Sequence, residues 1–254
     1  CRPVGWVCRP PADCRWGPPS LRQQGTQDSP PGIRYDPAMI VTIDGPAGVG
    51  KSTAARRLAE RLGFEFLDTG AMYRAVALCC LEQGHGTDEA AFVARIAQSV
   101  KIESLAGHVT CNGRDVTGLI RTPEVSQAAS LVAQNADVRK ALVEQQRAVA
   151  VGRNIVSEGR DQGTVVFPHA ECKFFLTADP RERALRRHRE LSAAGHAIAV
   201  EDLMRLQKER DDRDEMREIA PLKPADDAIV VDTTHELPDQ VLECLVENVR
   251  NRMS

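Results

Sequence analysis

The stretch Met39-Ile-Val-Thr-Ile-Asp-Gly-Pro-Ala-Gly-Val-Gly-Lys-Ser-Thr53 decides the fold of this chain. Gly45 is followed after four residues by Gly50-Lys51-Ser52, which matches the phosphate-loop pattern in full. The apolar residues 40–43 predict a short buried strand, and the Ala-, Arg- and Leu-rich residues 52–62 predict a helix. A glycine-rich turn between a strand and a helix directs backbone N–H groups and the positive end of the helix at phosphate oxygens. We therefore predict that the chain binds a nucleoside triphosphate.

Two side chains of this loop have expected roles in phosphate chemistry. Lys51 is expected to reach the β- and γ-phosphates, and the Ser52 hydroxyl to hold a phosphate-bound Mg²⁺. The alternative is an ordinary glycine turn before a helix. The complete order of strand, loop, Lys-Ser and helix favours the phosphate loop.

The bulk composition restricts the class of protein. The chain has 254 residues, of which 42% are hydrophobic and 27% charged, as is typical of a soluble globular protein. Its net charge of −3 gives no global field that favours nucleic acid or an anionic membrane, and no apolar run approaches the roughly 18 residues of a membrane span. The eight cysteines and six histidines form no metal-binding or catalytic spacing, and Cys79-Cys80 is expected in the core. We expect a cytoplasmic monomer with reduced thiols and no nucleic-acid or membrane partner.

Residues 1–38 differ from the rest of the chain. They contain eight of the fifteen prolines, both tryptophans and three cysteines, without a helical or strand period. Such a segment cannot bury enough apolar surface to offset the entropy of ordering it, and it lacks the apolar stretch of a secretory signal. The two interpretations are a tail that binds a partner and a disordered extension upstream of a start at Met39. We favour the extension, with one globular domain over residues 39–254.

From Met39 onward, strand-like and helix-like stretches alternate. Further strands are expected at 64–67, 154–158, 172–177 and 228–232. Helices are expected from about 69 to 81, 88 to 98, 123 to 151, 180 onward, 200 to 217 and 238 to 253. Asp179-Pro180 has the residue types that cap and start a helix. This alternation predicts an α/β fold with a mostly parallel sheet that is covered by helices on both faces.

One segment departs from the α/β pattern. Residues 100–104 and 108–111 read as strands, and Asn112-Gly113 is a strong signal for a two-residue hairpin. We therefore predict a small antiparallel β insert over residues 99–118.

Polar residues follow the predicted parallel strands, where ligands of such sheets bind. Asp68, Glu158 and the turn 159–161 are all expected beside the phosphate loop. Between residues 181 and 217 there are nine arginines and one lysine against nine acids, a net charge of +1. This balance argues against a nucleic-acid surface, and the simpler alternative is a pair of solvated helices with i,i+4 salt bridges. Transfer of a phosphoryl group to a second phosphate would use such arginines to neutralise charge, and it would need no general base.

Several motifs carry a resemblance to a known family. From Met39 to the C-terminus, about 215 residues, the chain resembles the bacterial cytidylate kinases, which transfer a phosphoryl group from ATP to CMP or dCMP. The resemblance rests on Ile43-Asp-Gly-Pro-Ala-Gly-Val-Gly-Lys51, Leu67-Asp-Thr-Gly-Ala-Met-Tyr-Arg74, Arg121-Thr-Pro-Glu-Val-Ser-Gln-Ala-Ala-Ser130, Gly159-Arg-Asp-Gln-Gly-Thr-Val-Val-Phe-Pro168 and Lys208-Glu-Arg-Asp-Asp-Arg-Asp214. It implies a P-loop three-layer fold with a five-stranded parallel sheet in the order 2-3-1-4-5. It also implies a short helical lid over about 181–217, with its tip at Ser192–Ala199, and places the insert in the CMP-binding part.

The resemblance also implies roles for individual residues. At CMP, the cytosine edge would be held by Thr69, Arg139 and Asp161, the sugar by Ser130, Arg210 and Asp214, and the phosphate by Arg74, Arg160 and Arg217, with Tyr73 in the same site. At ATP, the expected residues are Gly45, Pro46, Ala47, Gly48, Val49, Gly50, Lys51, Ser52, Thr53 and Arg187. The catalytic charges would be Lys51, Arg160, Arg213 and Arg217. Arg187, Arg213 and Arg217 would lie on helices that bring arginines over ATP when the lid closes. Mg²⁺ would be held by Ser52 and, through water, by Glu158.

Two other functions compete with this interpretation. A phosphate-loop kinase of a small hydroxyl substrate, similar to shikimate-type kinases, would use Asp68 as its base but would leave the many arginines unexplained. A nucleotide-binding switch or RNA-associated module would show a guanine-specifying Asn-Lys-x-Asp element or a basic face. The sequence contains neither feature.

Overall fold

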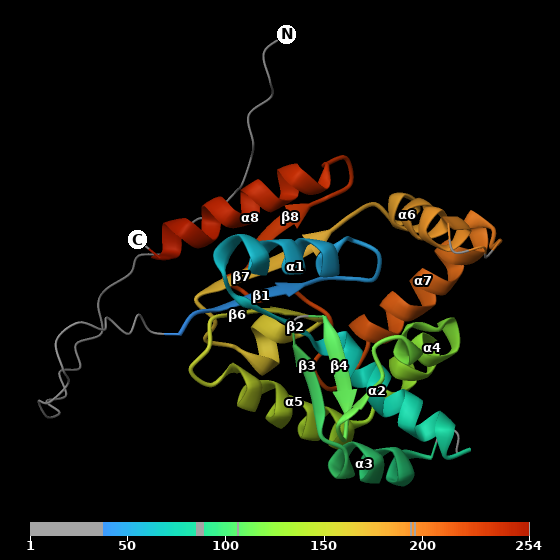
Figure 1. The fold of residues 1–254 in the computed structure, drawn as a ribbon. Coiled ribbons are helices and arrows are strands. Elements are labelled where there is room, and N and C mark those ends of the chain that lie inside the picture. The colour runs from blue at the N-terminus through green and yellow to red at the C-terminus, as the bar shows by residue number, and fades with distance from the viewer. Residues whose placement is uncertain (1–37, 85–88, 106, 194, 196, 254) are drawn as a thin grey trace, which may run out of the picture.

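A computed structural model describes residues 38–253, apart from residues 85–88, 106, 194 and 196. Its centre is a five-stranded parallel sheet in the order β2-β6-β1-β7-β8, which is 2-3-1-4-5 when these strands are numbered along the chain (Figure 1). This confirms the predicted topology. The strands are β1 (Ile40–Asp44), β2 (Glu65–Asp68), β6 (Ile155–Glu158), β7 (Cys172–Thr177) and β8 (Ile229–Asp232). The prediction for residues 1–37 lies outside the described part of the chain.

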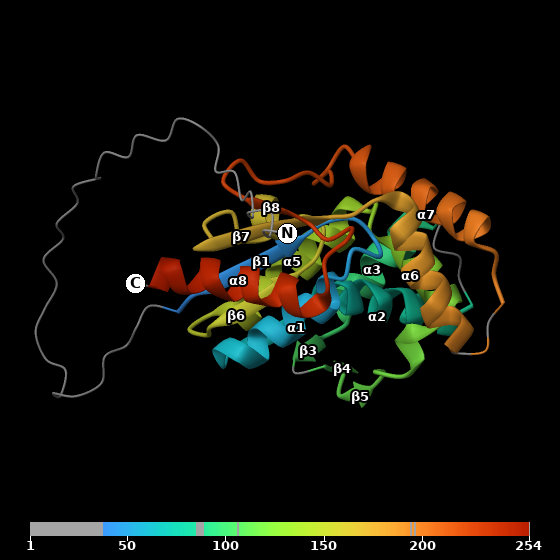
Figure 2. The same ribbon diagram turned by 90° about the horizontal axis from the view of Figure 1, so that it is seen from above.

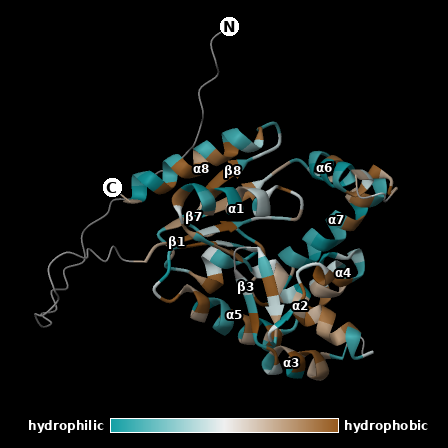
Figure 3. Ribbon diagram, viewed as in Figure 1, coloured by the Kyte–Doolittle hydropathy of each residue, from teal (hydrophilic) through white to brown (hydrophobic). Residues whose placement is uncertain are grey.

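Helices cover both faces of this sheet. Helices α1 (Lys51–Leu62) and α8 (Pro238–Met253) lie on one face, and α2 (Thr69–Glu82) and α5 (Ala136–Ala150) lie on the other (Figure 1). Successive residues of β6 alternate between the two cores, because strand side chains point to opposite faces. Figure 3 shows the hydrophobic residues gathered along the strands and on the inner faces of the helices. The described helices include none long and apolar enough to cross a membrane.

The predicted β insert is present. Strands β3 (Ile102–Leu105), β4 (His108–Cys111) and β5 (Arg114–Asp115) form a separate antiparallel sheet after helix α3 (Ala90–Ser99). Asn112 and Gly113 have φ values of 50° and 80°, as a tight hairpin turn between β4 and β5 requires. The hydroxyl of Ser104 donates to the backbone carbonyl of Asp68 at 3.1 Å, which joins the insert to the end of β2.

The long helical region predicted from Pro123 divides into two helices. A short helix, η1 (Leu119–Arg121), precedes α4 (Pro123–Val132), which is followed by α5. The side chain of Asn135 accepts hydrogen bonds from the N–H groups of Asp137 and Val138, so a new helix starts there. The sequence analysis also missed η2 (Gln162–Val166), a single π-helical turn after β6.

The late arginine-rich segment forms a helical pair beyond the carboxyl ends of the strands (Figures 1 and 2). It consists of α6 (Pro180–Ala193) and α7 (Val200–Glu215). Asp179 accepts hydrogen bonds from the N–H groups of Arg181 and Glu182, which confirms the predicted cap. The predicted lid tip, residues 192–199, is only partly described.

Candidate active site

The phosphate loop connects β1 to α1, as predicted. Gly45 has φ 143°, and a Cβ at this position would lie 2.1 Å from the carbonyl oxygen of Leu176, so only glycine lets the loop pass this close to β7. Gly50 forms the N-cap of α1 with φ 92°, and no side chain of the described residues caps this helix. The N–H groups of the first turn are therefore positioned to bind an anion.

The charge of Lys51 in this loop interacts with charged side chains elsewhere in the site. It is 6% exposed, and its Nζ donates to the carbonyl oxygen of Pro46 at 2.6 Å. Burial lowers the pKa of Lys51 well below its usual 10.5, and the positive charges of Arg160 and Arg210 lower it further, whereas Glu158 opposes them. The charges of these arginines thus act directly on the lysine of the phosphate loop.

Oxygen ligands gather at the edge of the sheet next to Lys51. Ser52 is exposed in the first turn of α1, Glu158 is 5% exposed at the end of β6, and Asp68 is the partner of Glu158 across the β2–β6 pair. Burial raises the pKa of Glu158 and the charge of Asp68 raises it further, while Lys51 and a hydrogen bond from Ser52 lower it. A bound cation would relieve this repulsion, and hydroxyl and carboxylate oxygens are ligands that suit Mg²⁺.

The described residues do not supply a complete set of protein ligands for a metal ion. The described residues contain no group of three or more His, Cys, Asp or Glu side chains that could hold a metal ion. Mg²⁺ usually keeps several waters and binds through one or two protein groups plus substrate phosphates. The residues present therefore fit a Mg²⁺ ion that arrives with a nucleotide.

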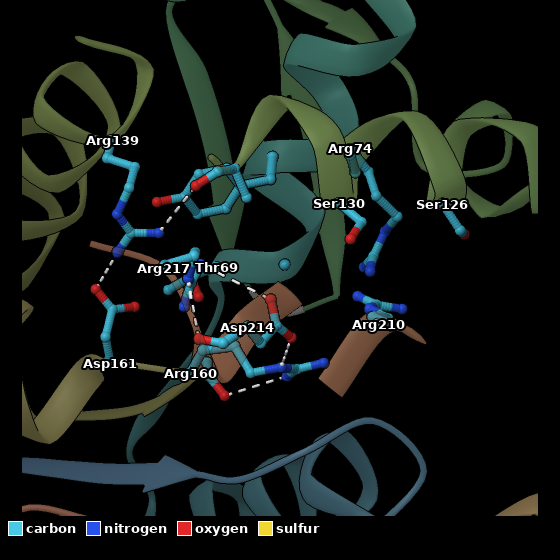
Figure 4. A pocket seen from close by; sticks show the side chains of 15 residues that line it. Thr69, Arg74, Ser126, Ser130, Arg139, Arg160, Asp161, Arg210, Asp214 and Arg217 are labelled. Atoms are coloured by element: carbon cyan, nitrogen blue, oxygen red, sulfur yellow. Dashed lines mark hydrogen bonds and ion pairs between the residues drawn. The ribbon is translucent and has the colours of Figure 1, made fainter. Parts of the chain in front are cut away.

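A cavity lies beside the loop between α2, α4, the turn after β6, and α7 (Figure 4). The structure brings together in its lining all ten residues that the sequence analysis assigned to CMP. The lining comprises Thr69, Gly70, Tyr73, Arg74, Ser126, Ala129, Ser130, Ala133, Arg139, Gly159, Arg160, Asp161, Arg210, Asp214 and Arg217. These residues come from five parts of the chain: α2, α4, α5, the turn after β6, and α7, including residues just after α4 and α7. Their common position is observed, while their individual roles stay predictions.

One end of the cavity contains a buried ion pair. The side chains of Arg139 and Asp161 are each 4% exposed and are directly hydrogen bonded (Figure 4). The Arg139 guanidinium also lies 5.8 Å from the centre of the Tyr73 ring. Burial raises the pKa of Asp161, whereas Arg139 and Arg217 lower it. Thr69 adds a hydroxyl here, which donates to the carbonyl oxygen of Glu158 at 2.6 Å.

The other end of the cavity is a cluster of arginines that are held in place by acids. Arg74 pairs with Asp68 at 3.2 Å, and Arg160 pairs with Asp214 at 2.9 Å. Burial lowers the pKa of Arg210 to about 10, and the charges of Arg160 and Arg74 contribute, although Asp214 opposes them. Figure 4 shows Arg74 and Arg210 facing each other across the cavity.

Polar atoms remain unsatisfied in this cluster. Within the described residues, buried side-chain atoms without a hydrogen-bond partner include Arg74 Nε, Arg210 Nε, Arg217 Nη2 and Ser130 Oγ. Buried donors without a partner are costly, so the cavity has the chemistry to bind an anionic, hydrogen-bond-accepting ligand.

The residues predicted to act at ATP and Mg²⁺ do not line this cavity, and three of them make other contacts or lie at the surface. Arg187 pairs with Glu190 at 2.9 Å, and its side chain is 42% exposed. The Nε of Arg213 donates to the carbonyl oxygen of Glu209 at 3.0 Å, and Arg213 lines a separate hollow with Gln134 and Met216. Thr53 is exposed on α1. In this arrangement of α6 and α7, neither Arg187 nor Arg213 lies in the lining of the cavity.

The sequence analysis missed a buried pair that connects α6 and α7 to the phosphate loop. Arg183 and Asp211 are hydrogen bonded to each other, and Arg183 also donates to the carbonyl oxygen of Ala47 at 3.1 Å. Asp211 accepts a weaker bond from the N–H group of Ala47 at 3.4 Å. The only sequence signal was the general richness of this segment in arginines and acids, which does not distinguish this pair from exposed ones.

Comparisons with known proteins show what the chain is similar to. The sequence model of the family described as "Cytidylate kinase" matches residues 41–251. The "Cytidylate kinase" of Rhodopirellula baltica is 47% identical over 212 residues, which cover 84% of this chain and 93% of the relative. That of Carboxydothermus hydrogenoformans is 47% identical over 213 residues, which cover 82% and 96%. A crystal structure of an uncharacterized protein from Eubacterium ventriosum superimposes with a TM-score of 0.50 and 11% identity, covering 84% of this chain and 98% of the other, and is similar in fold alone.

Proposed function

The chain belongs to the cytidylate kinase family, and we propose that it transfers the γ-phosphoryl group of ATP to CMP or dCMP at the cavity beside the phosphate loop. The products are ADP and CDP or dCDP. One observation carries the assignment to this cavity. Its lining joins a buried Arg–Asp pair to a cluster of arginines, several of which have buried donors without a hydrogen-bond partner among the described residues.

In this proposal, cytosine lies at the end of the cavity with Asp161, Arg139 and Thr69. Cytosine presents an amino group, which is a hydrogen-bond donor, where uracil presents a carbonyl acceptor. An ionised carboxylate only accepts hydrogen bonds, so Asp161 would select the amino group. The Arg139 partner opposes the rise in the pKa of Asp161 that burial causes, and so favours the ionised form.

The phosphate of CMP would lie at the arginine end. Arg74, Arg160 and Arg217 would bind its oxygens, and Ser130, Arg210 and Asp214 would contact the sugar. Because a nucleotide phosphate is already ionised at neutral pH, the reaction needs positioning and charge stabilisation rather than a general base. Arg160 and Arg217 can stabilise the negative charge that concentrates between donor and acceptor.

The donor would bind along the phosphate loop, with Lys51 at its β- and γ-phosphates. Arg187 and Arg213 would approach ATP only after α6 and α7 move. Ser52 and Glu158 would hold a Mg²⁺ ion, which neutralises charge on the ATP phosphates. The short connection of α6 and α7 to the loop through Arg183 would keep the two helices near the donor.

The competing hydroxyl kinase is disfavoured by the surroundings of Asp68. Its Oδ1 accepts a hydrogen bond from the N–H group of Ala71 at 2.8 Å, and its carboxylate also pairs with Arg74. A carboxylate that caps a helix and holds an arginine is poorly placed to take a proton from a substrate.

An ADP-release assay with CMP, dCMP, UMP, AMP and shikimate as acceptors tests the proposal. We expect turnover with CMP and dCMP, a much lower kcat/KM with UMP, and loss of activity when EDTA removes divalent cations. Turnover with shikimate alone would identify a hydroxyl kinase, and ADP release without any acceptor would identify a hydrolytic switch. The monomeric state stays a prediction, which the molar mass in solution would test.

A further inference from the structure

Asp44 is a buried acid that the proposed reaction does not use. It is the last residue of β1, directly before the phosphate loop, and it is 4% exposed. It is not among the residues that line the cavity. Both of its carboxylate oxygens accept hydrogen bonds from the backbone of the turn after β6. Oδ1 accepts one from the N–H group of Gln162 and Oδ2 one from that of Gly163, both at 2.8 Å.

These two N–H groups belong to the turn that carries the acceptor-binding residues. Arg160 and Asp161 directly precede Gln162, the first residue of η2. Asp44 itself directly precedes Gly45, the first glycine of the phosphate loop. One side chain therefore joins the backbone that is proposed to hold ATP to the backbone that is proposed to hold CMP, across 118 residues of sequence.

The packing around this contact requires a close approach. A Cβ on Gly163 would lie 2.9 Å from Thr42 Oγ1 and 3.4 Å from Asp44 Oδ2, with the Lys173 side chain at 3.2 Å. Any larger residue at 163 would push the turn away from Asp44. The glycine at 163 thus lets the turn lie against Thr42 and Lys173, close enough for its N–H group to reach Asp44.

Other side chains also hold this turn, since Arg147 donates to the carbonyl oxygens of Val165 at 2.8 Å and Val166 at 2.9 Å. Ser157 donates to the side-chain carbonyl of Gln162 at 2.8 Å, and Gln162 donates to Gln146 at a longer 3.4 Å. The carboxyl group of Asp44 differs from these partners, because it bonds to the two backbone N–H groups directly after Arg160 and Asp161. The position of Arg160 and Asp161 relative to the phosphate loop therefore depends on Asp44, in addition to their own pairs with Asp214 and Arg139.

We propose that Asp44 is a positioning residue that fixes the turn bearing Arg160 and Asp161 relative to the phosphate loop, and so aligns the acceptor phosphate with the donor. The inference rests on the proposed function. Loss of this contact lets the turn move while the phosphate loop keeps its own glycine geometry. Acceptor kinetics and the preference for CMP over UMP are then impaired, whereas ATP binding is kept.

Asp44→Asn tests the proposal, because one amide oxygen can replace one acceptor while the NH₂ group faces an N–H donor. We expect kcat/KM for CMP to fall by on the order of 10²-fold, as misplacement by about 1 Å can cause, while KM for ATP stays unchanged. Gly163→Ala should give the same pattern by displacing the turn instead. Because both variants break the same contact between Asp44 and the turn, kcat/KM for CMP in the double variant should be little lower than in either single variant.

Asp239→Asn is the control for the exchange of a carboxylate for an amide. This carboxylate is 82% exposed on α8, where it pairs with Arg57 at the surface. The kinetics of this variant should equal those of the wild type. If Asp44→Asn does not fold, Gly163→Ala carries the test.

Amide hydrogen exchange of residues 159–166 gives a readout that does not depend on activity. Exchange should accelerate in Asp44→Asn and Gly163→Ala but not in Asp239→Asn. Faster exchange with unchanged CMP kinetics would overturn the positioning role, as would parallel losses for ATP and CMP that follow Tm. A wild type that does not phosphorylate CMP would refute the proposed function, and the exchange measurements would still test the contact.

Discussion

Asp161→Asn is the substitution that most directly tests how the base is selected. Asp161 is buried against Arg139, and their side chains are each 4% exposed. Asparagine has nearly the same size, so the cavity keeps its shape. It replaces a group that only accepts hydrogen bonds by an amide that can accept or donate.

The size of the effect follows from the burial of this pair. In the wild type, the carbonyl of uracil would face the carboxylate and leave a buried acceptor unpaired, at a cost of about 1–3 kcal/mol, or roughly 5- to 150-fold in kcat/KM. An asparagine side chain can turn its NH₂ group to uracil, which removes most of this cost. We therefore expect the CMP:UMP ratio of kcat/KM to fall by about tenfold or more.

The same substitution should also affect stability. Arg139 loses a charged partner in a buried position, although the amide oxygen can still accept one hydrogen bond from it. Complete removal of one partner of a buried pair costs about 3–5 kcal/mol, so part of that cost is expected here. For a domain of this size, each kcal/mol lowers Tm by roughly 2–4 °C.

The assay is kcat/KM for CMP and for UMP in both proteins at a temperature where both are folded. Asp239→Asn is a matched control, because this carboxylate is 82% exposed on α8 and pairs only at the surface with Arg57. A CMP:UMP ratio that stays at the wild-type value in Asp161→Asn would refute the reasoning. The base would then have to be read at Thr69.

Four further outcomes are expected. Lys51→Met should reduce turnover by about 10³-fold or more, which steady-state kinetics would show. It should also raise Tm in calorimetry, because it removes a buried cation whose pKa is lowered by burial and by Arg160. Removal of residues 1–38 should leave activity and Tm unchanged in the same measurements, because the family match begins at residue 41. Burial raises the pKa of Asp44 from 3.8 to about 7, with Asp161 adding to the rise and the two N–H groups and Lys51 opposing it. Between these two pKa values the folded state therefore retains a proton that the unfolded state releases. The contribution of Asp44 to stability is lost as pH rises from about 4 through 7. Asp44→Asn should remove that part of the pH dependence of Tm, which thermal unfolding at a series of pH values would show. The Sγ atoms of Cys79 and Cys111 lie 3.3 Å apart, so prolonged treatment with oxidised glutathione at alkaline pH should close a disulfide, which the intact mass and a higher Tm would reveal.

The features that sequence reasoning predicted are those with a local or a recognisable signal. The phosphate loop, the Asp179 cap and the Asn112-Gly113 turn each depend on a few adjacent residues whose backbone preferences are known. The strand order came from the resemblance, since alternating strands and helices alone do not give it. The same resemblance assigned ten residues that the structure places around one cavity.

The features that were missed depend on contacts between distant backbone groups. Asp44 has backbone N–H groups as partners, and almost every residue type carries such a group, so residue types 162 and 163 do not identify the contact. Arg183 and Asp211 form one pair among many possible ones in a segment rich in both charges, and only their burial distinguishes them. The break between α4 and α5 depends on whether Asn135 points its side chain at the backbone, which composition does not determine.

The acids of the cavity explain how so many arginines can be kept in one place. Asp68, Asp161 and Asp214 each hold an arginine in the cavity without a ligand, so little side-chain freedom remains to be lost when a nucleotide binds. The burial of Asp214 raises its pKa, but Arg160, Arg210 and Arg217 together hold that pKa below its usual value, which shows that the acid is stabilised by the cluster. The cluster itself is not fully neutralised, since the pKa of Arg210 falls to about 10 and buried donors remain without partners. Phosphate groups would supply the missing acceptors and charge, and the site is therefore organised before binding but electrostatically complete only with its substrates.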